Sequence, residues 1–80
     1  MNENQIKEKL IAALRDIAPE VEVDDLNDKT NLQDQFDLDS VDVMNFIIKA
    51  QESFNIEIPN KDFRSFLIID NAVKYLAGLV

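Results

Sequence analysis

The residues best suited to chemistry lie in one acidic segment, Asp37-Leu38-Asp39-Ser40-Val41-Asp42. A long stretch of helical pattern follows it, so Ser40 is expected in the first turn of a helix that Asp39 caps. Backbone N–H groups in a first turn lack partners within the helix, and the helix dipole favours a phosphate ester there. The position suits a serine that carries a phosphodiester. A plain role for Ser40 within the cap explains the same spacing.

Ser40 is poorly equipped to act as a nucleophile by itself. The segment supplies no histidine or lysine base, and the whole chain contains no histidine, which excludes a Ser-His-Asp hydrolase on this chain alone. The chain also has no cysteine, which excludes disulfides, thiolate zinc sites, iron–sulfur clusters and a cysteine nucleophile. We therefore expect a serine that another enzyme modifies, with no catalytic residue and no metal site.

A helix from about Ser40 to Phe54 is predicted to position this serine. At about 100° per residue, five apolar residues share one arc and predict a core face. These are Val43, Phe46, Ile47, Ala50 and Phe54. Val41, Met44 and Ile48 occupy a second arc, roughly 130° from the first. This second face either packs beneath the preceding loop or meets a partner.

The segments before this helix predict a first helix and a long connection. Apolar spacing indicates a helix from about Asn4 to Ile17, and Pro19 disfavours its continuation. From Pro19 to about Asp39 no clean period exists, and apolar residues are scattered among acidic ones. We expect a loop that its own side chains pin in place, with room for one short helical turn.

The segments after it predict a short helix and a last long one. Asn60 is expected to cap the brief helix, and Asp70 the final one, with Tyr75 partly inward. The other residues predicted to point inward are Phe63, Phe66, Leu67, Val73, Leu76, Ala77 and Val80. No stretch alternates well enough for a strand. The expected fold is an all-α four-helix bundle, with three main helices, one short helix and a long first loop.

Size and charge narrow the possible functions. The 80 residues (9.2 kDa, 46% hydrophobic) predict a single domain over residues 1–80. The net charge of −8 and the pI near 4.2 repel nucleic acid and anionic lipid, and favour basic protein surfaces as partners. The same charge also serves solubility alone. The apolar runs are too short for a membrane span or a signal peptide, so we expect a cytoplasmic protein, monomeric and without a membrane span.

These residues together resemble the acyl carrier protein family. The resemblance rests on Asp39-Ser40-Val41-Asp42, the helix that ends at Phe54, and Glu57-Ile58-Pro59, and it covers nearly the whole chain. It implies a 4′-phosphopantetheine arm on Ser40, transferred from coenzyme A by a separate magnesium-dependent synthase. The thiol of the arm would hold acyl groups as thioesters. The partners implied are acyl-transferring, condensing and reducing enzymes of fatty-acid, polyketide or related biosynthesis.

The resemblance also implies roles for other residues. Asp39 and Asp42 match acids expected to engage the basic surface of the synthase. The implied partner-binding residues are Val41, Met44, Ile48, Glu52 and Glu57. The bundle interior would take up the acyl chain, with candidate lining residues Phe46, Ile47, Ala50, Phe54, Phe63 and Leu67. They can equally be plain core.

Some residues depart from the family pattern. Phe36-Asp37-Leu38 stands where most fatty-acid carriers have glycine. We therefore expect a loop built without free access to positive φ, although aspartate tolerates positive φ better than most residues. Asn45 and Gln51 replace common acids of the following helix, and Lys49 adds a positive charge. These departures favour a specialised carrier that meets general fatty-acid enzymes less well.

Three other functions compete with this interpretation. A stand-alone peptidyl or aminoacyl carrier would share the fold and the arm, but Asp39-Ser40 argues against it. An EF-hand fails because its loop needs an internal glycine, and the only glycine is Gly78. An unmodified helical module that binds partners through Val41, Met44 and Ile48 stays open. Attachment of phosphopantetheine to Ser40 distinguishes it from a carrier.

Overall fold

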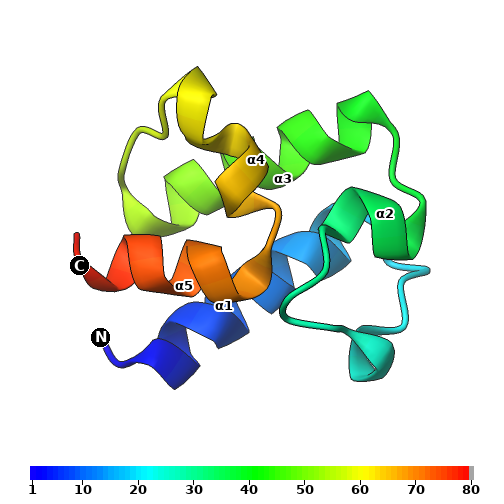
Figure 1. The fold of residues 1–80 in the computed structure, drawn as a ribbon, viewed down its shortest axis with the longest axis horizontal. Coiled ribbons are helices and arrows are strands. Elements are labelled where there is room, and N and C mark those ends of the chain that lie inside the picture. Colours follow the sequence, from blue (N-terminus) through cyan, green and yellow to red (C-terminus); the bar gives the residue numbers. More distant parts are fainter. Residues whose placement is uncertain (80) are drawn as a thin grey trace.

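The computed structural model describes residues 1–79, which form an all-α bundle (Figure 1). Its main helices are α1 (Glu3–Ile17), α3 (Ser40–Phe54) and α5 (Ile69–Ala77). The shorter pieces are α2 (Leu32–Phe36), α4 (Phe63–Phe66) and the 3₁₀ turns η1 (Val23–Asp25) and η2 (Asn60–Asp62). The predicted all-α fold is confirmed, and residues 1–79 contain no strand. The long loop holds more helix than the single turn expected, since α2 and η1 both lie in it.

Helix α1 is the base on which the other long helices pack. A capping box fixes its start: the Asn2 side chain accepts from the Gln5 N–H, and the Gln5 side chain accepts from the Asn2 N–H, both at 2.9 Å. Its buried face consists of Ile6, Leu10, Ala13 and Leu14. The helix packs against both α3 and α5. Both ends of the described chain lie far from the amino end of α3 (Figure 1).

The core is continuous and centred on aromatic side chains. Phe46 of α3 and Phe66 of α4 are fully buried, with ring centroids 6.4 Å apart. Tyr75 of α5 meets Phe66 edge to face at 5.9 Å, and its hydroxyl donates to Asp62 Oδ2 at 3.2 Å. Desolvation by burial, followed by this bond to the Asp62 carboxylate, raises the pKa of the Tyr75 hydroxyl above its ordinary value. The bond also links η2 to α5.

Two predicted caps differ from the structure. Asn60 is the first residue of η2 and does not cap α4, because the turn Asp62 N–H to Pro59 C=O precedes that helix. Asp70 lies inside the first turn of α5, whose N-cap is Ile68. Ile69 is fully buried, so the helix begins at this core residue, and the Asp70 N–H donates to the Asp28 carbonyl at 2.9 Å. The Asp70 carboxylate instead accepts from Lys74.

The predicted inward positions are otherwise mostly buried. Phe66, Leu67, Val73 and Leu76 belong to the core, and Phe63 and Tyr75 are half-buried against it. Ala77 is exposed, contrary to prediction, because it is the last residue of α5 and the chain leaves the core there. Val80, also predicted to point inward, lies outside the described residues.

The loop between α1 and α3 is pinned, as predicted. Leu32 and Leu38 are buried in the core, and Val21, Leu26 and Phe36 are half-buried against it. Two backbone bonds of 2.9 Å join the loop to the carboxyl-terminal half: Asp70 N–H to Asp28 C=O, and Leu32 N–H to Leu67 C=O. Lys7 of α1 reaches the Asp28 carboxylate at 2.7 Å. The loop is therefore part of the folded body.

The turn that leads to α3 uses the conformation that glycine would supply. Asp37 ends α2 with φ 54° and ψ 44°, in the left-handed region. Its N–H donates to the Gln33 carbonyl, and Leu38 then enters the core. Aspartate tolerates this region better than most residues, so the turn forms without glycine.

Substitutions at Asp37 should report this backbone strain. Asp37→Val is expected to lower the free energy of unfolding by about 1–2 kcal/mol, because a β-branched residue is strongly disfavoured at positive φ. Asp37→Gly should leave stability unchanged or raise it slightly. Asp37→Asn controls for the lost charge, since asparagine also tolerates the left-handed region. Urea denaturation followed by circular dichroism measures all three, and equal stability of the valine and asparagine variants contradicts the strain argument.

Candidate functional site

Ser40 is the first residue of α3 and is exposed to solvent. The predicted cap is confirmed: Asp39 is extended (φ −85°, ψ 176°), and its carboxylate accepts from the Asp42 N–H at 2.8 Å. The Asp39 carbonyl accepts from the Val43 N–H at 3.1 Å. The N–H groups of Ser40 and Val41 come before Val43, the first residue whose N–H donates to a carbonyl of the helix, so they have no acceptor within it. Since Asp39 provides the cap, the Ser40 hydroxyl is not needed for it.

The second apolar arc of α3 is exposed. Val41, Met44 and Ile48 expose 64%, 43% and 44% of their surfaces, so they do not pack beneath the loop. Glu52 and Glu57, the acids grouped with them by sequence, are also exposed. Large apolar side chains exposed together on one helix are typical of a protein-binding surface.

The residues suggested as an acyl-chain lining form much of the core. Phe46, Ile47 and Ala50 are fully buried, and Phe54 and Leu67 are 7% and 4% exposed. Phe63 is half-buried at the edge of this group. A chain could reach the interior only if these side chains separated, so their role in acyl binding stays a prediction.

The negative charge is concentrated in the segment of sequence that leads up to Ser40. Between Glu20 and Asp42 lie nine of the 16 acidic residues and one of the eight basic ones. The rest of the chain carries seven of each sign and is neutral overall. The whole net charge of −8 therefore belongs to the loop, α2 and the first turn of α3. Residues 1–79 contain no cluster of three His, Cys, Asp or Glu side chains that could hold a metal ion.

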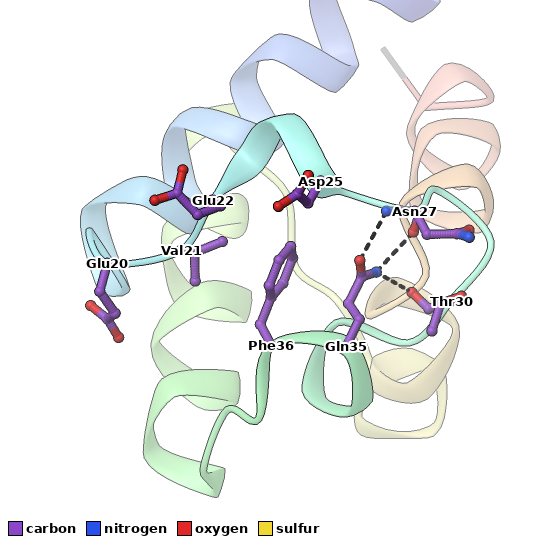
Figure 2. A pocket seen from close by; sticks show the side chains of 8 residues that line it. All are labelled: Glu20, Val21, Glu22, Asp25, Asn27, Thr30, Gln35 and Phe36. Atoms are coloured by element: carbon purple, nitrogen blue, oxygen red, sulfur yellow. Dashed lines mark hydrogen bonds between the residues drawn. The ribbon is translucent and has the colours of Figure 1, made fainter.

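Two glutamines, Gln35 and Gln51, bond to backbone groups of the segments before and after α3. Gln51 stands where an acid was expected, and its Oε1 accepts from the Ile58 N–H at 2.8 Å. This bond closes the turn in which Asn55 adopts φ 54°. Gln35 lies beside Phe36 and reaches back to the loop at Asn27, next to a hollow lined by acidic side chains (Figure 2). Each glutamine bonds to a backbone group of another segment, so the apolar spacing of its own helix does not predict the bond.

Comparison with known proteins identifies the family to which the chain belongs. Residues 8–68 match the sequence profile of a family described as "Phosphopantetheine attachment site". The chain belongs to this family. The carrier is 30% identical to an acyl carrier protein of Lactobacillus acidophilus over 95% of its own length and 94% of the relative's. It is 24% identical to an acyl carrier protein of Myxococcus xanthus, over 90% of this chain and 95% of the relative. It is 31% identical to an acyl carrier protein of Renibacterium salmoninarum, over 89% of this chain and 91% of the relative.

Each of these relatives aligns with this chain over nearly its entire length. No solved structure matches the carrier. The cofactor of the family is covalently attached 4′-phosphopantetheine, and acyl carrier proteins are non-catalytic carriers that interact with a transferase and with biosynthetic enzymes. Within residues 1–79 no helix is both long and apolar enough to span a membrane.

Proposed function

We propose that the 4′-phosphopantetheine arm is attached to Ser40 and that this chain carries acyl groups as thioesters on it. The observation that carries the proposal is the exposed position of Ser40 at the amino end of α3. The other two serines are placed differently: Ser53 lies near the end of α3, and Ser65 lies in the four-residue α4. Ser40 alone combines an accessible hydroxyl with the amino end of a long helix.

The surroundings of Ser40 fit a phosphodiester that another enzyme installs. First-turn N–H groups and the positive end of the α3 dipole favour the phosphate charge. Asp39 and Asp42 oppose it, so a basic partner surface has to balance these carboxylates during transfer. The chain supplies no histidine or cysteine, and the base that removes the proton of the Ser40 hydroxyl belongs to the transferase. The Ser40 oxygen bonds to the pantetheine-bearing phosphorus of coenzyme A, the pyrophosphate bond breaks, and adenosine 3′,5′-bisphosphate leaves. The bound arm supplies the thiol for thioester formation.

The proposed partners dock on the exposed side of α3. Val41, Met44 and Ile48 supply apolar contact next to Ser40, and the acids around them, with Glu52 and Glu57 further along the chain, attract basic surfaces. In this proposal the chain is a single-domain, monomeric, cytoplasmic carrier without catalysis of its own. The core residues around Phe46 would receive the acyl chain, and the half-buried Phe63 marks the edge where it would enter.

The cargo belongs to fatty-acid, polyketide or related biosynthesis, and a dedicated enzyme set is favoured. Asn45 and Lys49 are exposed on α3 where acids would strengthen docking, and Gln51 is used for a backbone bond. Acidic attraction therefore comes from the segment before Ser40 more than from the helix behind it. Partners that rely on acids along α3 should bind this carrier less well.

Salt should weaken the association with a basic transferase. The KM for the carrier is expected to rise several-fold between about 50 and 300 mM NaCl, because exposed charges are strongly screened over that range. Initial rates of loading at a fixed concentration of coenzyme A measure this KM. The stability of the transferase over the same range of salt is the control for salt effects on the enzyme. A KM that does not change with salt contradicts electrostatic docking.

The experiment that tests the function is intact-mass analysis after incubation with coenzyme A, magnesium and a broad-specificity phosphopantetheinyl transferase. The gain of one phosphopantetheinyl group on Ser40 supports the proposal. A folded protein that gains none favours the unmodified interaction module, whose exposed Val41, Met44 and Ile48 would then be its binding surface.

A further inference from the structure

Helix α2 is the least self-sufficient element beside the attachment site. Its five residues are too few to be stable as an isolated helix, so other contacts must hold it. The broad helix packing of the bundle joins α1 with α3 and α5, and α4 with α5. In α2, Leu32 is buried, Phe36 is half-buried, and Asn31 caps the start by accepting from the Gln33 N–H at 2.8 Å. The Leu32 N–H also donates to the Leu67 carbonyl at 2.9 Å, which ties the start of α2 to the carboxyl-terminal half. A polar side chain near the end of α2 provides a further anchor.

That side chain is Gln35. Its Oε1 accepts from the Asn27 N–H at 2.9 Å, while its Nε2 donates to the Asn27 and Thr30 carbonyls, both at 2.8 Å (Figure 2). The amide thus bonds to three backbone groups. The bond to the Thr30 carbonyl is partly buried and the two to Asn27 are exposed, and losing the amide would leave all three without this partner. The segment it holds is itself fixed to α5 through the Asp28 carbonyl and to α1 through Lys7. Gln35 therefore connects α2 to the rigid body of the bundle.

The end of α2 leads directly to Ser40. Only the strained Asp37, the buried Leu38 and the cap Asp39 separate the two helices. If α2 moves, this short connection moves with it, and so do the carboxylates of Asp34 and Asp37. An enzyme that docks over the amino end of α3 meets this surface as well as Ser40. Docking would then have to order it, at a cost in binding free energy.

We propose that Gln35 is a positioning residue for loading of the carrier. It holds α2 and the turn before Ser40 in the arrangement that the transferase recognises, and it touches neither the serine nor the arm. This inference rests on the proposed attachment at Ser40. Preorganisation lowers the cost of forming the complex and leaves the chemical step unchanged, so Gln35 acts on KM and not on kcat.

The test compares Gln35→Ala with Gln33→Ala, a glutamine of the same helix with an exposed side chain. Steady-state loading from coenzyme A is followed by intact mass at a temperature where both variants are folded by circular dichroism. Gln35→Ala is expected to raise the KM for the carrier roughly five-fold with kcat within about two-fold of wild type. Gln33→Ala should match wild type. Hydrogen exchange should quicken at the Asn27 amide in Gln35→Ala alone.

Equal KM values for the two variants overturn the proposal, as does a loss confined to kcat. A purely structural role for Gln35 predicts a lower midpoint of thermal unfolding with an unchanged KM. Measuring both quantities therefore distinguishes a structural role from a positioning role. If Gln35→Ala does not fold, Gln35→Met takes its place, because methionine keeps the length and apolar packing of the side chain without its hydrogen bonds. Failure of wild type to load overturns the attachment at Ser40 instead, so the two proposals fail in distinguishable ways.

Discussion

Wild-type protein incubated with coenzyme A, magnesium and a broad-specificity transferase is expected to gain one phosphopantetheinyl group per chain, and Ser40→Ala none. The effect is all or nothing, because alanine has no oxygen to form the phosphodiester. The fold should persist in the variant: Asp39 supplies the cap of α3 through its bond to the Asp42 N–H, and the exposed Ser40 side chain is not needed for it. Intact mass and circular dichroism on the same samples measure both results.

Two serines of the same chain serve as controls for this loss. Ser53→Ala and Ser65→Ala remove exposed hydroxyls of α3 and α4 and should load like wild type. Loading of Ser40→Ala would place the attachment on another residue. Absence of loading in folded wild type would remove the carrier function and leave the exposed apolar surface of α3 as the protein's main feature.

Phe46→Ala is expected to lower the free energy of unfolding by about 3–5 kcal/mol, the usual cost of emptying a buried aromatic position. The ring of Phe46 is fully buried and packs 6.4 Å from that of Phe66, which in turn meets Tyr75. Small domains have a total stability of about 5–15 kcal/mol, so this variant should be close to unfolding at room temperature. Urea denaturation followed by circular dichroism measures the change.

Met44 offers a matched control on the same helix. It is 43% exposed, and Met44→Ala should change the free energy of unfolding by less than about 0.5 kcal/mol. If Phe46→Ala does not fold, Phe46→Leu should retain the fold at a cost of about 1–2 kcal/mol. A loss below about 1 kcal/mol in Phe46→Ala would mean that its surroundings collapse readily, and would favour a core able to open for an acyl chain.

The long helices were predictable because their signals are local. The helix from Ser40 to Phe54 has both predicted ends, since an aspartate cap and a helical apolar period lie within the same stretch of chain. For Val41, Met44 and Ile48 the sequence left two possibilities, packing beneath the loop or exposure to a partner, and the structure shows exposure. Choosing between them required knowing where the loop packs, which depends on contacts between distant segments.

The caps of the last two helices show where local rules fail. Asp70 has a favourable residue type for an N-cap, yet burial of Ile69 moves the helix start, and the Asp28 carbonyl takes the N–H of Asp70. Likewise, the roles of Gln35 and Gln51 depend on backbone groups eight and seven residues away, respectively, that only the fold brings near. At Asp37 the lack of a glycine led to the expectation of a loop without free access to positive φ, yet the turn adopts φ 54° there, because aspartate tolerates the left-handed region.

The separation of the chain ends from the amino end of α3 has a practical consequence (Figure 1). A purification tag, a surface anchor or a neighbouring domain joined to Met1 would extend from the far side of the bundle and leave Ser40 uncovered. The carrier can therefore be immobilised by that end on a sensor chip with its reactive face towards the solution. The same geometry would let Ser40 stay accessible whether the bundle is tethered to an enzyme or free in solution.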